Sequence, residues 1–194
     1  PAVDFKEAYD YVHRNFMKKT VHAGEAYGPE SIFQAITECH ADRIGHGCFL
    51  FSDDMIRSPE ITDRQDYVKR LSQYIADRRI TIEVCLSSNL QTNPQIHSLA
   101  EHSFGRMRAS NLSCTLCTDN RLVSRTTMCR DLGLALEHFP ITAKELKDLL
   151  VYGFKRSFYP GPYEEKRRYV RSVINFYEEL QRRHLPETAA AGEA

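Results

Sequence analysis

The stretch "VHAGEAYGPES" (Val21–Ser31) places an imidazole and a carboxylate at the end of a short apolar run. Gly24 and the β-branched entry "TV" disfavour a helix here, so we predict a strand that ends at His22. Glu25 then lies in the loop beyond that strand. Enzymes of the α/β class carry their functional residues at this place, just past the carboxyl ends of parallel strands. The stretch therefore predicts an α/β fold with a functional site at its strand ends.

The same strand-and-helix unit recurs along the chain. Strand-like segments are "KTVHA" (19–23), "ADRIGHG" (41–47), "ITIEVCLSSN" (80–89) and "LSCTLCTDN" (112–120). Apolar spacing typical of helices occurs in residues 4–16, 29–40, 61–79, 126–139, 141–158 and 163–183, and more weakly in 96–110. Pro29 suits a helix start, and Thr62 with Gln65, like Thr142 with Glu145, fits a capping box. Alternating strands and helices predict a parallel sheet.

Each predicted strand carries polar residues at its carboxyl end, at His22, His46, Ser87 and Asp119. This distribution is typical of the catalytic face of a (β/α)₈ barrel, which needs eight strands and typically about 250 residues. The 194 residues of this chain supply four such strands. We therefore expect residues 1–183 to be the second half of a TIM barrel, in a truncated product that lacks the first half. Residues 184–194 are expected to be a disordered tail.

The composition argues against several kinds of partner. Lys+Arg and Asp+Glu each total 26, so we expect neither nucleic acid nor a membrane surface as a partner. No apolar run is long enough to span a bilayer, and no signal-peptide pattern opens the chain. Six scattered cysteines favour a reducing compartment, and we expect the cytoplasm. Cys114 and Cys117 fall within a predicted strand on opposite faces, which favours two small apolar residues over a zinc or redox pair.

The polar residues at the strand ends could form one site. In a parallel barrel, His22, Glu25, His46, Asp119 and Asn120 converge over the axis. Imidazole nitrogen and carboxylate oxygen suit zinc or a similar divalent ion, and the remaining groups could act as acid or base. Taken singly, each histidine could be structural, Asp119 could cap a helix, and Glu25 could be a solvated loop carboxylate. These alternatives must all hold at once at aligned strand ends, so we favour a site.

Four motifs resemble the adenosine deaminase family. They are "VHAGE" (21–25), "ADRIGHG" (41–47), "IEVCLSSNLQT" (82–92) and "LCTDNRLVSRTT" (116–127), and their order and spacing are similar to the C-terminal half of that family from about Thr20 to about Tyr177. The family fold is a (β/α)₈ barrel with one catalytic zinc ion. The resemblance implies that the four strands here are the fifth to the eighth.

The resemblance also implies a role for each residue of the site. His22 and Asp119 would be zinc ligands, and Asp119 would also contact the attacking water. His46 would orient the attacking hydroxide, and Glu25 would donate a proton to the purine ring nitrogen beside the reacting carbon. Burial would have to raise the pKa of Glu25 for that task. Asn120 would bind the substrate, where many members have a second Asp, and its amide keeps an acceptor oxygen and adds a donor.

The chain departs from the family in one important respect. The family's metal site needs a His-x-His pair on its first strand, and no His-x-His occurs here. With His22 and Asp119 alone, zinc would have two protein ligands in place of the usual three or more. We therefore expect adenosine or 2′-deoxyadenosine deamination only in the full-length enzyme, with this fragment inactive until the N-terminal half is supplied.

The sequence is also compatible with other functions. The protein could be another 6-aminopurine aminohydrolase, such as an adenine or aminodeoxyfutalosine deaminase, or a non-catalytic remnant that binds a partner. The deaminases that act on bases in nucleic acid use H-x-E with P-C-x-x-C. This chain has H-x-x-E, and its C-x-x-C lacks the proline, so that class is rejected.

Overall fold

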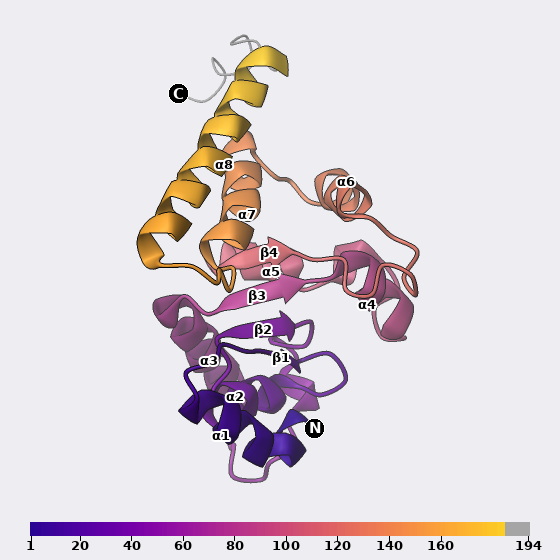
Figure 1. The fold of residues 1–194 in the computed structure, drawn as a ribbon. Coiled ribbons are helices and arrows are strands. Elements are labelled where there is room, and N and C mark those ends of the chain that lie inside the picture. The colour runs from indigo at the N-terminus through magenta and orange to yellow at the C-terminus, as the bar shows by residue number, and fades with distance from the viewer. Residues whose placement is uncertain (185–194) are drawn as a thin grey trace. The chain divides into compact units, whose positions relative to one another are not determined.

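The computed structural model describes residues 1–184, which fall into two compact units that divide between Ile141 and Thr142. The first unit contains a parallel four-stranded sheet in the order β1-β2-β3-β4, and the four arrows in Figure 1 point the same way. The strands are β1 (Thr20–Ala23), β2 (Arg43–His46), β3 (Thr81–Val84) and β4 (Cys114–Leu116). Sequential order in a parallel sheet is what a barrel segment requires.

Helices connect the strands, as the alternating pattern predicted. The helices of the first unit are α1 (Lys6–Arg14), α2 (Pro29–Thr37), α3 (Arg64–Arg78), α4 (Leu86–Thr92), α5 (Phe104–Ala109) and α6 (Met128–His138). The short 3₁₀ helices are η1 (Ala2–Phe5), η2 (Asp53–Met55) and η3 (Leu99–Glu101). Pro29 occupies the first turn of α2, where its missing N–H costs nothing.

The two faces of β1 differ in burial. Val21 and Ala23 are buried with the apolar residues of the neighbouring strands and helices, whereas Thr20 and His22 point to the other face and are exposed. Parallel sheets normally have both faces covered. The open face of β1 is the one that would line the interior of a barrel, so β1 has the burial pattern expected at the cut edge of a barrel segment.

Two local predictions were wrong. The helix α3 is capped by Asp63, whose carboxylate accepts from the backbone N–H of Asp66 at 2.9 Å, and not by Thr62 with Gln65. The segment "CLSSN", assigned to the end of a strand, instead opens α4 at Leu86. Ser and Asn favour helix starts and turns because their side chains bond to nearby backbone groups, and this local preference ends β3 early.

The cysteine pair is also placed differently from the prediction. The strand β4 ends at Leu116, so Cys117 lies just beyond it while Cys114 lies within it. Cys114 is buried, Cys117 is partly buried, and both are free thiols. Burial raises the pKa of both thiols, to about 12 for Cys114 and about 11 for Cys117, so both remain neutral and unreactive near pH 7.

The second unit consists of α7 (Ala143–Lys155) and α8 (Tyr163–His184) within the described residues. The predicted capping box is confirmed, with Thr142 and Glu145 exchanging side-chain-to-backbone hydrogen bonds. An ion pair of 2.7 Å joins Lys147 of α7 to Glu178 of α8. The helix α8 includes His184, and the rest of the predicted tail, residues 185–194, lies outside the described residues. No helix in residues 1–184 is both long and apolar enough to cross a bilayer.

Candidate active site

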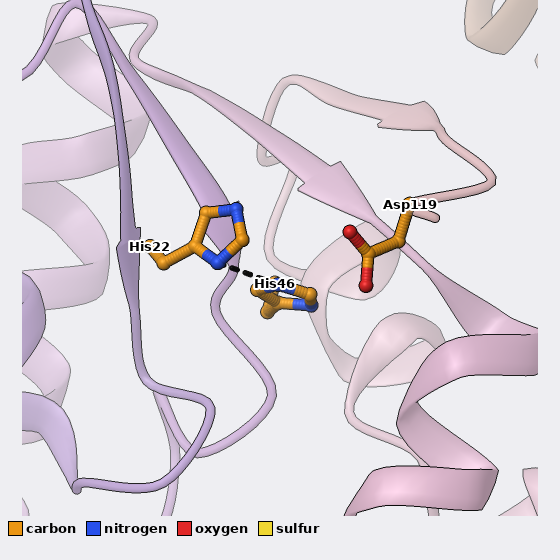
Figure 2. Close-up of side chains that lie close together, drawn as sticks. All are labelled: His22, His46 and Asp119. Carbon is orange, nitrogen blue, oxygen red and sulfur yellow. Dashed lines mark hydrogen bonds between the residues drawn. The ribbon is translucent and has the colours of Figure 1, made fainter. Parts of the chain in front are cut away.

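Three predicted site residues meet at the carboxyl edge of the sheet. His22 lies on β1, His46 ends β2, and Asp119 follows β4. One potential ligand atom from each lies within 4.8 Å of the other two. Figure 2 shows the imidazole of His46 between the ring of His22 and the carboxylate of Asp119. Residues almost a hundred positions apart in the chain are therefore gathered into one cluster, as the strand-end argument predicted.

The backbone around this cluster is unusual. His46 has φ 68° and Asp119 has φ 54°, both in the left-handed region that side chains other than glycine rarely adopt. Gly45 is paired with His22 in the sheet, and a Cβ at Gly45 would lie 2.8 Å from Cδ2 of His22. The glycine therefore provides the space that the His22 ring occupies.

Glu25 lies beside both histidines. Its Oε2 is 3.2 Å from Nε2 of His46 and 3.7 Å from Nδ1 of His22. Burial raises the pKa of the Glu25 carboxyl, His22 partly offsets this effect, and the negative charge of Asp119 adds to it. A raised pKa is the property expected of a general acid, so the direction of this shift meets the requirement that the proposed role places on Glu25.

The electrostatics keep His46 uncharged. Its side chain is 1% exposed, and burial together with the nearby His22 lowers its pKa to about 4. Its Nε2 lies 3.2 Å from Nδ1 of His22, and the two rings meet edge to face with centroids 4.5 Å apart. A neutral imidazole at pH 7 can donate from one nitrogen and accept at the other, so His46 can orient a water molecule or bind a metal.

Asn120, the predicted substrate contact, also has a structural role in the loop after Asp119. Its Oδ1 accepts from the backbone N–H groups of Leu122 (3.2 Å) and Val123 (3.1 Å), so it stabilises the turn that follows Asp119. The acceptor oxygen of the amide is engaged in the loop. Its NH₂ group is the part that could face a ligand.

The sequence reasoning missed the role of α4. Ser88 donates to Oδ2 of Asp119 at 2.8 Å, and the amide of Asn89 lies 3.0 Å from Nδ1 of His46. Ser87 donates its backbone N–H to the fully buried carboxylate of Asp131 on α6. These contacts span 31 to 44 residues of sequence. Only the polar run "SSN" after an apolar strand could have signalled them.

The donor set fits a zinc ion. Imidazole nitrogen and carboxylate oxygen are among the atoms that zinc binds in catalytic sites, which usually combine three protein ligands with an open position for water. The hydroxyl of Ser88 orients the carboxylate of Asp119 through a hydrogen bond, and the absence of a side chain at Gly45 leaves room for the ring of His22. The cluster therefore has both the ligand types and the supporting contacts of a metal site.

Comparison with known proteins identifies the class and then the family. Solved structures that resemble the chain include an adenine deaminase from Arthrobacter aurescens (TM-score 0.74, 18% identity, 92% of this chain and 49% of that one). An amidohydrolase from Burkhoderia ambifaria with bound Zn has a TM-score of 0.70 at 20% identity, covering 91% of this chain and 45% of that one. An Arabidopsis protein, ADAL, complexed with IMP has a TM-score of 0.65 at 26% identity, covering 86% and 43%. The fold is thus part of a (β/α)₈ barrel, which confirms the predicted fold class.

The family follows from the sequence comparison. The adenosine deaminase family model matches residues 1–176. Adenosine deaminase 1 of Streptomyces coelicolor is 36% identical over 192 residues, which is 98% of this chain and 47% of that protein. The chain belongs to the adenosine deaminase family. It spans about half the length of the curated relatives that it matches.

Proposed function

We propose that the complete barrel to which this chain contributes hydrolyses adenosine or 2′-deoxyadenosine to inosine or 2′-deoxyinosine and ammonia. The observation that carries the proposal is the convergence of His22, His46 and Asp119 within 4.8 Å, with Glu25 beside them. This is the combination of metal-binding and acid–base groups that hydrolytic attack on an aromatic ring requires. His22 and Asp119 are the proposed zinc ligands, completed by ligands from the other half of the barrel.

The roles follow from the chemistry of the ring. A bound zinc ion would lower the pKa of water from about 15.7 to about 7 and so make hydroxide available at neutral pH. Attack at the carbon that bears the amino group breaks conjugation, and negative charge develops on the adjacent ring nitrogen. Glu25, whose pKa burial raises, is the proposed donor of the proton that this nitrogen must receive. His46 and Asp119 orient the attacking oxygen, and the NH₂ of Asn120 is available to the imidazole portion of the purine.

Other substrates of the same ring chemistry are the main alternative. Adenine, AMP and aminodeoxyfutalosine all carry an amino group at the same carbon, and IMP, bound to the Arabidopsis neighbour, is the 6-oxopurine that deamination of AMP yields. These substrates differ in what is attached to the purine, and the proposed roles of His22, Glu25, His46 and Asp119 concern only the ring. The match to curated adenosine deaminases at 36% identity favours the nucleoside.

The remaining expectations belong with this proposal. The six thiols of the described residues are free, which fits the reducing cytoplasm. A purine nucleoside and the N-terminal half of the barrel are the proposed partners. The competing hypothesis is that the protein is not an enzyme but a non-catalytic remnant that binds a partner. An assay for ammonia release distinguishes the two functions.

The experiment compares the chain alone with the chain coexpressed with the N-terminal half of the Streptomyces coelicolor relative. Both samples are loaded with zinc and tested for ammonia release from adenosine, 2′-deoxyadenosine, adenine and AMP. We expect activity only in the completed barrel, with the two nucleosides as the best substrates. A completed barrel that binds zinc but prefers adenine or AMP would overturn the substrate assignment. Zinc binding without any deamination would overturn the enzymatic one.

A further inference from the structure

A buried line of polar groups lies behind His46. The backbone N–H of Phe104 is 3.1 Å from Nδ1 of His102, and Nε2 of His102 is 3.2 Å from Oδ1 of Asn89. The amide nitrogen of Asn89 is in turn 3.0 Å from Nδ1 of His46. Asn89 is 0% exposed and His102 is 3% exposed, so water does not compete for these contacts.

The first group in the line fixes the direction of every hydrogen bond. A backbone N–H can only donate, so Nδ1 of His102 must accept, and neutral His102 carries its proton on Nε2. That proton is donated to the Oδ1 of Asn89. The NH₂ of Asn89 is then the group that faces His46, and it donates to Nδ1 of His46. The ring proton of neutral His46 must therefore lie on Nε2, on the side of Glu25 and His22.

We propose that Asn89 and His102 are positioning residues that hold His46 as its Nε2–H tautomer, with this proton directed into the active site. The consequence for catalysis rests on the proposed function: His46 donates a hydrogen bond to the attacking oxygen and does not bind the metal through Nε2. This separates His46 from His22 and Asp119, although all three offer ligand atoms within 4.8 Å of one another.

The opposite tautomer conflicts with the buried contacts. If His46 carried its proton on Nδ1, the amide of Asn89 would have to turn so that its oxygen faced His46. Its NH₂ would then face the Nε2–H of His102, and two donors would oppose each other without water. An unsatisfied buried donor is costly. Cys48 Sγ, 3.8 Å from the same nitrogen of His102, is too weak an acceptor to compensate.

The test reads the tautomers directly by NMR. The metal-free chain is labelled with ¹⁵N-histidine, and long-range couplings between ring protons and ring nitrogens show which nitrogen of His46 and His102 is protonated. Associated material is measured by magic-angle-spinning NMR. Both rings are expected to be Nε2–H. In Asn89→Asp the carboxylate can only accept, so His46 is expected to change to the Nδ1–H tautomer while its ring stays in place.

Two further variants control for folding and for chemistry. His102→Gln keeps a donor near the position of Nε2 and is expected to preserve the His46 tautomer. Asn93→Asp makes the same chemical change at a buried position at the end of α4, and its amide nitrogen has no hydrogen-bond partner among the described residues. It is expected to leave the His46 tautomer unchanged.

The outcomes separate this inference from the proposed function. A wild-type His46 that carries its proton on Nδ1 would overturn the inference, whatever the variants do. So would Asn89→Asp with an unchanged tautomer, or Asn93→Asp with the same change. The measurement involves neither purine nor metal, so it stands or fails independently of whether the completed barrel releases ammonia.

Discussion

The hydroxyl of Ser88 donates a 2.8 Å hydrogen bond to Oδ2 of Asp119. Ser88 is almost fully buried on α4, whereas Asp119 lies in the loop after β4 with a left-handed backbone. The bond holds one oxygen of a carboxylate that lies close to His22 and His46. A short helix thus orients the carboxylate that the metal site needs.

The first prediction concerns this bond. Ser88→Ala is expected to weaken zinc binding by the completed barrel by about 10–100-fold, the usual effect of removing a hydrogen-bond partner of a metal ligand. Zinc affinity is measured by competition with a chromophoric chelator. Ser72→Ala is the matched control because its exposed hydroxyl donates to the carbonyl of Lys69 and has no other bond within residues 1–184. Equal zinc affinity in Ser88→Ala and wild type would show that Asp119 needs no such support.

The second prediction tests whether the ring of His22 needs the room that Gly45 leaves beside it. Gly45→Ala places a methyl group 2.8 Å from Cδ2 of His22, a separation at which one of the two must move. We expect the ring to turn away from Asp119 and zinc affinity to fall. Gly133→Ala in α6 is the control, since nothing lies within 4 Å of its added Cβ, and it should stabilise the helix by up to about 1 kcal/mol. Unchanged zinc affinity in Gly45→Ala would mean that His22 is not a ligand in this geometry.

The third prediction tests whether Glu25 acts as a general acid or as a zinc ligand. Glu25→Gln in the completed barrel is expected to lower turnover by about 10²–10⁴-fold, the typical contribution of a general acid, while zinc content stays at the wild-type level. Turnover is measured as ammonia release and zinc by elemental analysis of the same samples. Glu60→Gln, at an exposed position, is the control. Loss of zinc in Glu25→Gln would assign Glu25 to the metal instead.

The fourth prediction follows from the burial of His102. Burial, with a smaller contribution from His46, lowers the pKa of His102 from 6.5 to about 4. Between these values the unfolded chain binds the proton and the folded chain does not, so stability rises with pH and is lost as pH falls from 6.5 towards 4. The shift corresponds to at most roughly 3 kcal/mol.

Urea unfolding of the metal-free chain between pH 7 and pH 4.5 measures this loss. His102→Gln cannot take up a proton, so its stability should fall less steeply with acidification than that of wild type. His97→Gln changes an exposed histidine in the same segment and should follow the wild-type curve. Parallel curves for wild type and His102→Gln would show that His102 is not the group that acid protonates.

The sequence predicted the sheet order and the site cluster because both follow from local patterns. Alternating strands and helices set the parallel sheet, and the strand ends then place His22, His46 and Asp119 together. The capping box at Thr142 and Glu145 was also predictable, since it lies within four consecutive residues.

The contacts behind the site were not predictable in this way. Asn89 meets His46 and His102, which are 43 and 13 residues away, and nothing in the segment "SSNLQT" distinguishes a side chain that turns inward from one that faces solvent. Asp63, with an extended backbone at ψ 94°, caps α3 although Thr62 is also of a capping residue type. Tertiary packing decides such details, and residue spacing alone does not encode them.

The last prediction concerns the chain by itself. In the order β1-β2-β3-β4, β1 and β4 are the two edges of the sheet, and unpaired strand edges recruit other chains. The side chain of His22 is 62% exposed, and the open face of β1 is where a barrel interior would be. The isolated chain is therefore expected to associate, to bind zinc weakly and to release no ammonia from adenosine, with or without added zinc. Light scattering and an ammonia assay on the same sample test this, and coexpression with an N-terminal half-barrel that carries His-x-His should reduce association and restore activity. A monodisperse monomer that deaminates adenosine unaided would contradict the half-barrel interpretation, because four strands would then supply a complete metal site and purine pocket.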